Sequence, residues 1–275
     1  MGSLVTAPGT VETFVASDMD APSIHPFLDG AAVVFTRSSP ERDTPNEDAA
    51  LLLQYGEGAG LLAVADGAGG TRGGGEAARI AVEAIRATLL DADAGEVPLR
   101  TVVLNSLELA NRRICELGTG AGTTIVVAQL RDGHVRPFHV GDSMILVCGQ
   151  RGRIRLQNVP HGPVGYGVHA GLIDESDAMH HEHRHLVSNL LGSDDMRIEI
   201  GSRLDLAARD TIVVASDGLS DNLLTSEIVD AARCGPIDAA ARKLAEVSVR
   251  RMTSPSDTQP SAPDDLTFIL FRRSR

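Results

Sequence analysis

The sequence predicts an α+β protein in which helices cover the faces of antiparallel sheets. Short apolar runs of β type are joined by turns too short for a parallel crossover, and helical patterns enter the chain in pairs. The obvious loops fall near the ends of the 275 residues, and no linker divides the middle. One large domain is therefore favoured over two small ones.

The predicted strands are short runs rich in Val, Ile, Leu and Ala. Several neighbours are separated only by turn residues, at 56–60 (GEGAG), at Asp132-Gly133 and at 149–152 (GQRG), so we expect antiparallel hairpins. The runs lie at 31–35, 49–55, 61–66, 123–130, 135–140, 143–148, 154–157, 211–216 and 266–271.

Helical patterns, in which apolar residues recur at a spacing of 3.6, occupy about 75–90 and 99–117. In the first of them, Ile80, Ala84, Ala87 and Leu89 suit one buried stripe. Further helices are expected at about 176–191, 220–232 and 237–251.

The two ends of the chain differ from its middle. Residues 1–30 are mixed in character, carry prolines and show no clear period, which predicts an N-terminal extension or an irregular edge. Residues 31–275 form the predicted domain. Within it, the Pro- and Ser-rich stretch 252–263 is expected to be a loop before the last strand.

Composition narrows the partners and the compartment. The net charge of -12 would repel a phosphate backbone, so nucleic acid is not expected as a partner. No apolar run approaches the length of a membrane span, and the first 30 residues lack the order of a secretory signal, so we expect a cytoplasmic protein without membrane contact. Cys115, Cys148 and Cys234 show no CxxC spacing, and neither disulfides nor a cysteine-rich zinc site are indicated.

Aspartates occur at the ends of the predicted strands, where a buried carboxylate must be hydrated, hydrogen-bonded or bound to a cation. Asp-Gly is an ordinary turn dipeptide, and for any single one of these acids turn chemistry is a sufficient explanation. The near-identical contexts VADG (64–67) and ASDG (215–218) are not explained by turns alone. The strand-end acids are Asp48, Asp66, Asp142, Asp217, Asp264 and Asp265.

Several carboxylates without histidine or cysteine at matching positions favour Mg²⁺ or Mn²⁺ over zinc. A cluster of four or more suits two cations about 3.5 to 4 Å apart, the arrangement that activates a water and neutralises a phosphoryl oxygen. Hydrolysis of a phosphate ester is the chemistry that this pattern indicates.

Six motifs in order resemble those of the metal-dependent protein phosphatase 2C family, over about residues 30–272. The resemblance implies a β-sandwich flanked by pairs of helices (α-β-β-α) and a Mg²⁺- or Mn²⁺-dependent serine/threonine protein phosphatase. The motifs are NEDA (46–49), ADGAGG (65–70), GTTIVVA (122–128), HVGDS (139–143), ASDGLSDNL (215–223) and DDLTFIL (264–270).

Carried over by position, the resemblance implies that Asp48, Asp66, Asp217 and Asp264, with the carbonyl of Gly67, organise two cations whose bridging hydroxide attacks phosphorus. Asp142 and Asp221 match acids that, with Asp217, hold a third and weaker cation in some relatives. The implied partner is a phosphorylated protein, with a serine/threonine kinase opposing the enzyme. A monomer is expected.

The sequence departs from the family pattern at several positions near these acids. Ala68 stands where some relatives have a histidine, so water, another side chain or an easy leaving group must supply the leaving-group proton. Asp265 stands in the place of an asparagine. Met144 replaces the arginine of the GDS motif, a change that we attribute to packing. Glu47 is expected either to hold metal-bound water or to have no role.

The arginine that clamps phosphate in the family normally stands about five residues before the first metal aspartate. Asp43 occupies that position here. Arg42, one residue earlier, is the predicted phosphate ligand because a guanidinium suits bidentate contact with phosphate. Arg37 is the alternative, and simple solvation at the surface is the third possibility.

Two other motifs invite different functions. The glycines from Gly67 to Gly75 contain no P-loop, and Arg72 stands where a dinucleotide-binding pattern needs its last glycine, so we expect glycine there for positive φ and close approach to the metal site. HEHRH (181–185) satisfies HExxH, in which His181, His185 and Glu182 would serve a zinc peptidase. The flanks of this motif do not bury that helix face. We therefore expect a solvated helix here, within the flap segment of about 160–192. The alternative is that its histidines act in substrate access or pH response.

A catalytically silent phosphatase-like binding module is the remaining alternative function.

Overall fold

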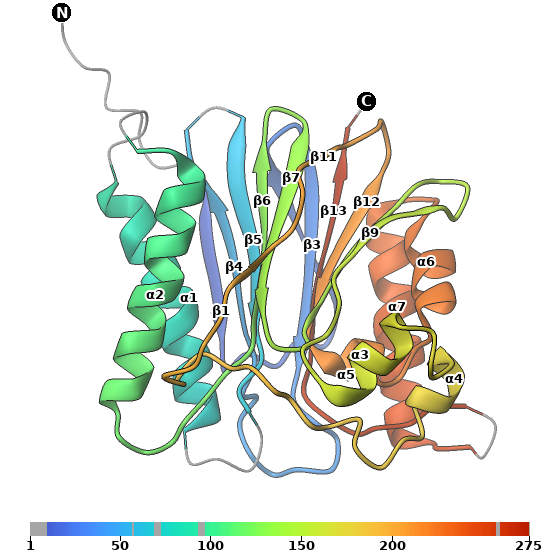
Figure 1. Cartoon of the computed structure of the whole chain (residues 1–275). Helices are drawn as coiled ribbons and strands as arrows, with labels where there is room; N and C mark the ends of the chain where they lie inside the picture. The colour runs from blue at the N-terminus through green and yellow to red at the C-terminus, as the bar shows by residue number, and fades with distance from the viewer. Residues whose placement is uncertain (1–9, 57, 69–72, 93–96, 257–258, 275) are drawn as a thin grey trace, which may run out of the picture.

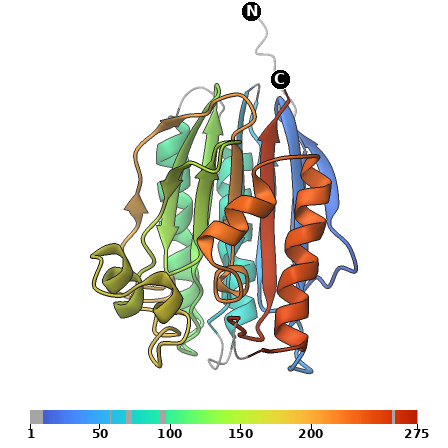
Figure 2. The same ribbon diagram turned by 90° about the vertical axis from the view of Figure 1, so that its right-hand side faces the viewer.

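Two antiparallel sheets pack face to face, and pairs of helices cover both outer faces, as the computed structural model shows (Figure 1). The structure describes residues 10–56, 58–68, 73–92, 97–256 and 259–274. Helices α1 (Gly74–Asp91) and α2 (Leu99–Glu116) cover one sheet, and α6 (Thr225–Ala232) and α7 (Ile237–Thr253) cover the other (Figure 2). The predicted α-β-β-α architecture is confirmed.

The first sheet has the order β1-β4-β5-β6-β7-β10, with β11 also pairing with β7. Its strands are β1 (Val11–Val15), β4 (Ala49–Gln54), β5 (Ala59–Ala65), β6 (Ile125–Arg131), β7 (His134–Val140), β10 (Glu199–Ile200) and β11 (Leu204–Asp205).

The second sheet has the order β2-β3-β13-β12-β8-β9. Its strands are β2 (Ser23–Phe27), β3 (Gly30–Arg37), β13 (Leu266–Arg273), β12 (Thr211–Ala215), β8 (Met144–Cys148) and β9 (Ile154–Gln157).

Burial on both faces explains why the central strands are apolar runs and not alternating patterns. In β4, Leu51 and Leu53 face the helices α1 and α2, whereas Ala50 and Leu52 face the second sheet. The layer between the sheets includes Leu62, Val214 and Ile269, each fully buried. Side chains on both sides of each sheet therefore fix the strand register, which in turn fixes where the strands end.

The helices before residue 120 and the last helix agree with the predictions. Ile80, Ala84 and Leu89 of the predicted stripe are buried, and Ala87 is half-buried. The helix expected at 220–232 is instead two: α5 (Asp217–Ser220) and α6. Leu224 separates them, and its N–H donates to the Glu227 side chain at 2.9 Å.

The prediction of a long helix at 176–191 is wrong. Only α4 (Glu175–Ala178) forms there, followed by turns, and a further helix, α3 (Pro163–His169), precedes it. Turn-type backbone bonds, such as Arg184 N–H to the His181 carbonyl, replace the helical ladder. The stretch is polar at most positions and has no apolar stripe that a core could bury.

The prediction that residues before 31 are irregular is wrong for two segments. β1 pairs with β4 and β2 pairs with β3, each at an edge of its sheet. Both are short, with half-exposed side chains, and Pro26 lies in β2, features common at sheet edges that weaken a strand pattern. Residues 1–9 lie outside the described residues, and the boundary at residue 30 stays a prediction.

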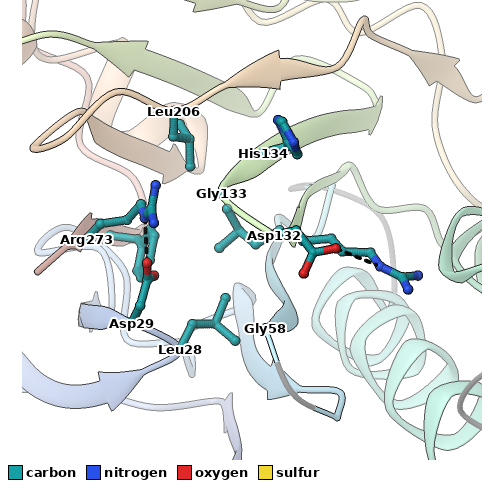
Figure 3. Close-up of a pocket in the computed structure, with 11 residues that line it drawn as sticks. Leu28, Asp29, Gly58, Asp132, Gly133, His134, Leu206 and Arg273 are labelled. Atoms are coloured by element: carbon teal, nitrogen blue, oxygen red, sulfur yellow. Dashed lines mark hydrogen bonds and ion pairs between the residues drawn. The ribbon is translucent and has the colours of Figure 1, made fainter.

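Turns of both sheets meet at the end of the sandwich remote from Asp66, around a small pocket of 170 Å³ (Figure 3). There the Nε atom of Arg273 lies 2.6 Å from Oδ2 of Asp29, which ties the end of β13 to the β2–β3 turn. The strand-end acids lie at the opposite end.

Among the described residues, no helix combines the length and the apolar character needed to cross a bilayer.

Leu52 tests the packing between the sheets. Leu52→Ala should lower the free energy of unfolding by about 2 to 5 kcal/mol, because a fully buried side chain leaves a cavity between two rigid layers. Leu172→Ala, at a residue 81% exposed, should change it by less than about 0.5 kcal/mol. Urea unfolding followed by circular dichroism measures both, and equal losses would contradict this description of the core.

Candidate metal centre

The end of β5 places Asp66 and Gly67 beside the start of β6. The Thr124 N–H donates to the Asp66 carbonyl at 2.9 Å, and the Thr123 hydroxyl donates to the same oxygen at 2.7 Å. The Ala68 N–H donates to the Gly122 carbonyl at 3.0 Å. The GTT segment (122–124) therefore holds the backbone of the Asp66-Gly67-Ala68 turn in place.

The start of β4 places Asp48 beside the end of β12. The Ser216 hydroxyl donates to Oδ2 of Asp48 at 2.8 Å, and the Thr267 N–H donates to the Ser216 oxygen at 3.0 Å. The Asn46 side chain accepts the Asp48 N–H at 2.9 Å and donates to the hydroxyl of Thr36 at 2.9 Å. Buried groups of the second sheet and the Asn46 side chain thus fix Asp48 in place.

The second sheet supplies the other acids of the cluster. Asp217 begins α5 directly after β12, and Asp221 follows the same short helix. Asp264 and Asp265 precede β13, which pairs with β12. Asp142 lies in the β7–β8 turn, between the two sheets.

Gly67 and Gly73 are glycines for different reasons, one for close backbone approach and the other for its backbone conformation. A Cβ added to Gly67 would lie 2.4 Å from the Gly74 carbonyl carbon and 2.8 Å from the Glu47 carbonyl oxygen. Gly73, with φ of 106°, precedes α1 in a left-handed conformation that favours glycine. Close backbone approach is confirmed at Gly67 and positive φ at Gly73, whereas residues 69–72 lie outside the described residues and an approach to a metal site stays a prediction.

The carboxylates act on one another electrostatically, with Asp217 at the centre. Burial raises the pKa of Asp66 well above its ordinary value, and Asp217, Asp48 and Asp142 raise it further. Burial and then Asp265 raise the pKa of Asp48 in the same way. Asp66 and Asp217 also interact through their side chains, which raises the pKa of Asp66 and lowers that of Asp217.

The remaining members of the cluster show the same effect. Burial, followed by repulsion from Asp221, raises the pKa of Asp217 to about 6. Burial raises that of Asp221 to about 6 against the opposing charge of Arg184, and burial and Asp217 raise that of Asp264 to about 6. Ionising so many neighbouring buried carboxylates together is unfavourable, and bound cations would offset that cost.

These donors fit hard divalent cations. All are oxygens, from carboxylates and the Gly67 carbonyl, which is the donor set of Mg²⁺ and Mn²⁺. Oδ1 of Asp142 is buried and has no hydrogen-bond partner among the described residues, as expected of an oxygen that awaits a cation or its bound water.

Arg42 reaches the acid cluster, and Arg37 does not. Nη1 of Arg42 lies 3.1 Å from Oδ1 of Asp264, and the side chain stays 42% exposed, so its other N–H groups face solvent. Arg37 lines a separate small pocket with Asp18 and Val249.

Glu47 and Asp265 hold the segment that carries Arg42. Oε1 of Glu47 accepts the Gly75 N–H at 3.4 Å, close to the start of α1. The two oxygens of Asp265 accept the N–H groups of Ser39 and Glu47, each at 2.7 Å. An asparagine would offer a single acceptor oxygen, whereas each of these two donors has its own carboxylate oxygen here.

The HExxH motif does not form a helix, so His181 and His185 do not share a helical face. The zinc-peptidase hypothesis is therefore not supported. Within the described residues, another group, His139, His161 and Glu199, has the spacing of metal ligands. Its two rings stack with centroids 4.3 Å apart and an angle of 28°, so their in-plane lone pairs do not converge on one point. Moreover, Nδ1 of His161 already accepts the Gly141 N–H at 3.1 Å.

Sequence reasoning missed the residues that support the acids. Asn46, Ser216 and Thr124 lie inside or beside the quoted motifs, and their buried positions next to acids were the available signal. Arg184 was missed for another reason. It lies within HEHRH, where only the histidines and the glutamate carry the metal-binding pattern, and its contact with Asp221 joins segments remote in sequence.

A groove of about 600 Å³ opens beside the acids, between the flap segment and α6. Asp142, Asp217, Asp221 and Arg184 lie on its lining. Met144, in place of the family's arginine, also lines it and packs in the core under α6 and α7. The apolar part of the lining comprises Met144, Ile154, Val159, Pro160, Val164, Val168, Ala178, Met179 and Val229.

Residues 37–256 match the model of the family described as "Protein phosphatase 2C". The chain belongs to the protein phosphatase 2C family. It is 28% identical over 198 residues to the protein phosphatase PhpP of Streptococcus pneumoniae, covering 69% of this chain and 79% of that protein. It is 26% identical over 242 residues to the serine/threonine phosphatase stp of Listeria welshimeri, covering 83% and 90%.

Solved structures agree with this family. The S. agalactiae serine/threonine phosphatase has a TM-score of 0.76 and 27% identity, and the match covers 88% of this chain and 99% of that one. The catalytic domain of the phosphatase PstP, described in complex with 2 manganese ions, has a TM-score of 0.70 at 22% identity, covering 88% and 96%. The protein is therefore a metal-dependent serine/threonine protein phosphatase of the 2C type.

The acid cluster predicts that, without metal, the folded protein is less stable at neutral pH than at mildly acidic pH. The raised pKa values mean that the folded protein binds more protons than the unfolded one between about pH 4 and pH 6. Stability is therefore fully present below the unfolded values and is lost as pH rises through about 6. In EDTA, the free energy of unfolding should be lower at pH 7.5 than at pH 5, because the buried carboxylates of the folded protein ionise over this range.

Chemical denaturation at both pH values, with EDTA or with Mn²⁺, measures this effect. Mn²⁺ should stabilise the protein more at pH 7.5 than at pH 5, and Asp217→Asn should flatten the pH dependence in EDTA. Equal stability at both pH values in EDTA would contradict the electrostatic description.

Proposed function

We propose that Asp48, Asp66, Asp217, Asp264 and the carbonyl of Gly67 hold two divalent cations and so form the catalytic centre. The observation that carries the proposal is the convergence of acids from both sheets on Asp217, with mutually raised pKa values. Asp142 and Asp221, together with Asp217, are the donors for a third and weaker ion. Mg²⁺ and Mn²⁺ both fit an all-oxygen set.

The cations, when bound, lower the pKa of a water that attacks phosphorus and neutralise charge on the phosphoryl oxygens. The protein's own groups position the substrate for that attack. Arg42 donates its exposed N–H groups to the phosphate. The ion pair with Asp264 holds its guanidinium beside the proposed metal centre. Asp265 holds the backbone of the segment from Ser39 to Glu47, on which Arg42 lies.

The proton for the leaving serine or threonine oxygen comes from solvent in this proposal. Ala68 carries no ionisable group where some relatives have a histidine. The groove beside the acids is open, so water reaches the leaving oxygen without a relay through the protein.

The same groove accommodates the chain of a phosphorylated protein on either side of the modified residue. Its volume of about 600 Å³ exceeds what a phosphate group needs, and its lining combines apolar side chains with polar and charged ones. A serine/threonine kinase that phosphorylates the same protein would be the opposing enzyme.

We also propose a monomeric protein of the cytoplasm. Cys115, Cys148 and Cys234 are free thiols, which suits a reducing compartment. The large exposed apolar side chains belong to different elements, such as Ile24 in β2, Leu90 in α1 and Ile154 in β9, as is usual for a surface without a permanent interface.

Asp66→Asn and Asp217→Asn should each abolish hydrolysis of a phosphopeptide and of a small aryl phosphate. The loss should exceed the roughly 10- to 100-fold that replacing an outer-shell group costs a metal enzyme. Asp195→Asn, at an exposed acid of the same charge, is the control and should keep full activity. Steady-state assays with Mn²⁺ measure the activity of each variant. Full activity of Asp66→Asn or of Asp217→Asn would refute the assignment.

Arg42→Ala should lower kcat/KM for a phosphopeptide about 10- to 100-fold, since a charged hydrogen bond to phosphate contributes about 1.5 to 3 kcal/mol. Most of the loss should fall on KM if Arg42 binds the ground state. Arg37→Ala is the matched control and should leave both constants unchanged. A loss with Arg37→Ala and none with Arg42→Ala would assign phosphate binding to the other arginine.

A further inference from the structure

The HEHRH segment places one cation, Arg184, against the acid cluster. Nε of Arg184 lies 3.7 Å from Oδ2 of Asp221, and the side chain is 26% exposed. Nη1 of the same guanidinium donates to the carbonyl oxygen of Met179. The flap thus sets a permanent positive charge beside acids that belong to the second sheet and to α5.

The surroundings of Arg184 keep its guanidinium there. The Met179 carbonyl oxygen accepts a hydrogen bond from Nη1, and Asp221 forms an ion pair at Nε. Nearby, Oε1 of Glu175 accepts the Thr225 N–H at 2.7 Å, which ties α4 to the start of α6. The guanidinium also lowers the pKa of both Asp217 and Asp221, against the effect of burial.

Arg184 shares this part of the groove lining with Asp142, Asp217 and Asp221. These three acids are the donors for a third divalent ion in the proposed function. A divalent cation among them would meet the positive charge of the guanidinium at short range, and the repulsion is strong in a partly buried site. In the proposed function, the first two ions would be held by Asp48, Asp66, Asp217, Asp264 and the Gly67 carbonyl, and none of these five residues has an ion pair with Arg184 among the described residues.

We propose that Arg184 is a built-in cation at the Asp142–Asp217–Asp221 end of the cluster and that it weakens binding of a third divalent ion there. The inference rests on the proposed metal centre and concerns the third ion alone. Binding of that ion requires Arg184 to leave Asp221, so occupancy of the third place and the position of the flap oppose each other.

Calorimetric titration of the metal-free protein with Mn²⁺ at pH 7.5 tests this, with no enzymatic readout. The wild type should bind two ions tightly and a third only weakly. Arg184→Gln should bind the third ion about tenfold more tightly and leave the first two affinities unchanged. Arg184→Lys, which keeps the charge, should resemble the wild type.

Two controls separate a local effect from a general one. Arg203→Gln removes one positive charge from an exposed residue at another pocket and should leave the third affinity unchanged. In an Asp221→Asn background, binding of the third ion should stay weak with or without Arg184→Gln, because one of its three donors is lost.

The proposal is overturned if Arg184→Gln leaves the third affinity unchanged, or if Arg203→Gln strengthens it equally. It is also overturned if the wild type itself binds three ions with similar affinity, a result that needs no variant to fold. Failure to bind the first two ions would instead refute the proposed metal centre, so the two failures are distinguishable.

Discussion

Repulsion among carboxylates collected around Asp217 is the interaction on which the rest of the structure depends. Burial and neighbouring charges raise the pKa values of Asp48, Asp66, Asp142 and Asp264 together with that of Asp217. A fold that gathers such acids is destabilised at neutral pH unless something compensates. The apolar layers of the sandwich supply the stability that tolerates the cluster, and bound cations relieve it.

The architecture explains how acids distant in sequence reach one place. Strands β5 and β12 lie in different sheets, and both finish at the same end of the sandwich (Figure 1). The residues that follow the two strands therefore lie close together. Small hydroxyl side chains then fix the carboxylates. Thr124 and Thr123 hold the turn at Asp66, and Ser216 holds Asp48. Rigid strands carry the site, and the flap contributes an arginine to its margin.

Much of this could be predicted from the sequence, and the failures have physical causes. The central strands and α1, α2 and α7 were predictable because burial imposes a strong pattern on them. β1 and β2 were not, since edge strands are half exposed. The helix expected at 176–191 failed because that polar segment is held by contacts such as Arg184 with Asp221, which no local pattern encodes. The acids themselves stood out through their repeated contexts, whereas the reason for Asp265 became visible only with its two N–H donors in place.

A crystal of the protein soaked in Mn²⁺ and measured at the manganese absorption edge tests the central claim most directly. Two anomalous peaks, about 3.5 to 4 Å apart, should lie among Asp48, Asp66, the Gly67 carbonyl, Asp217 and Asp264. The absence of any peak there, or a single peak at His139, His161 and Glu199 instead, would contradict the account.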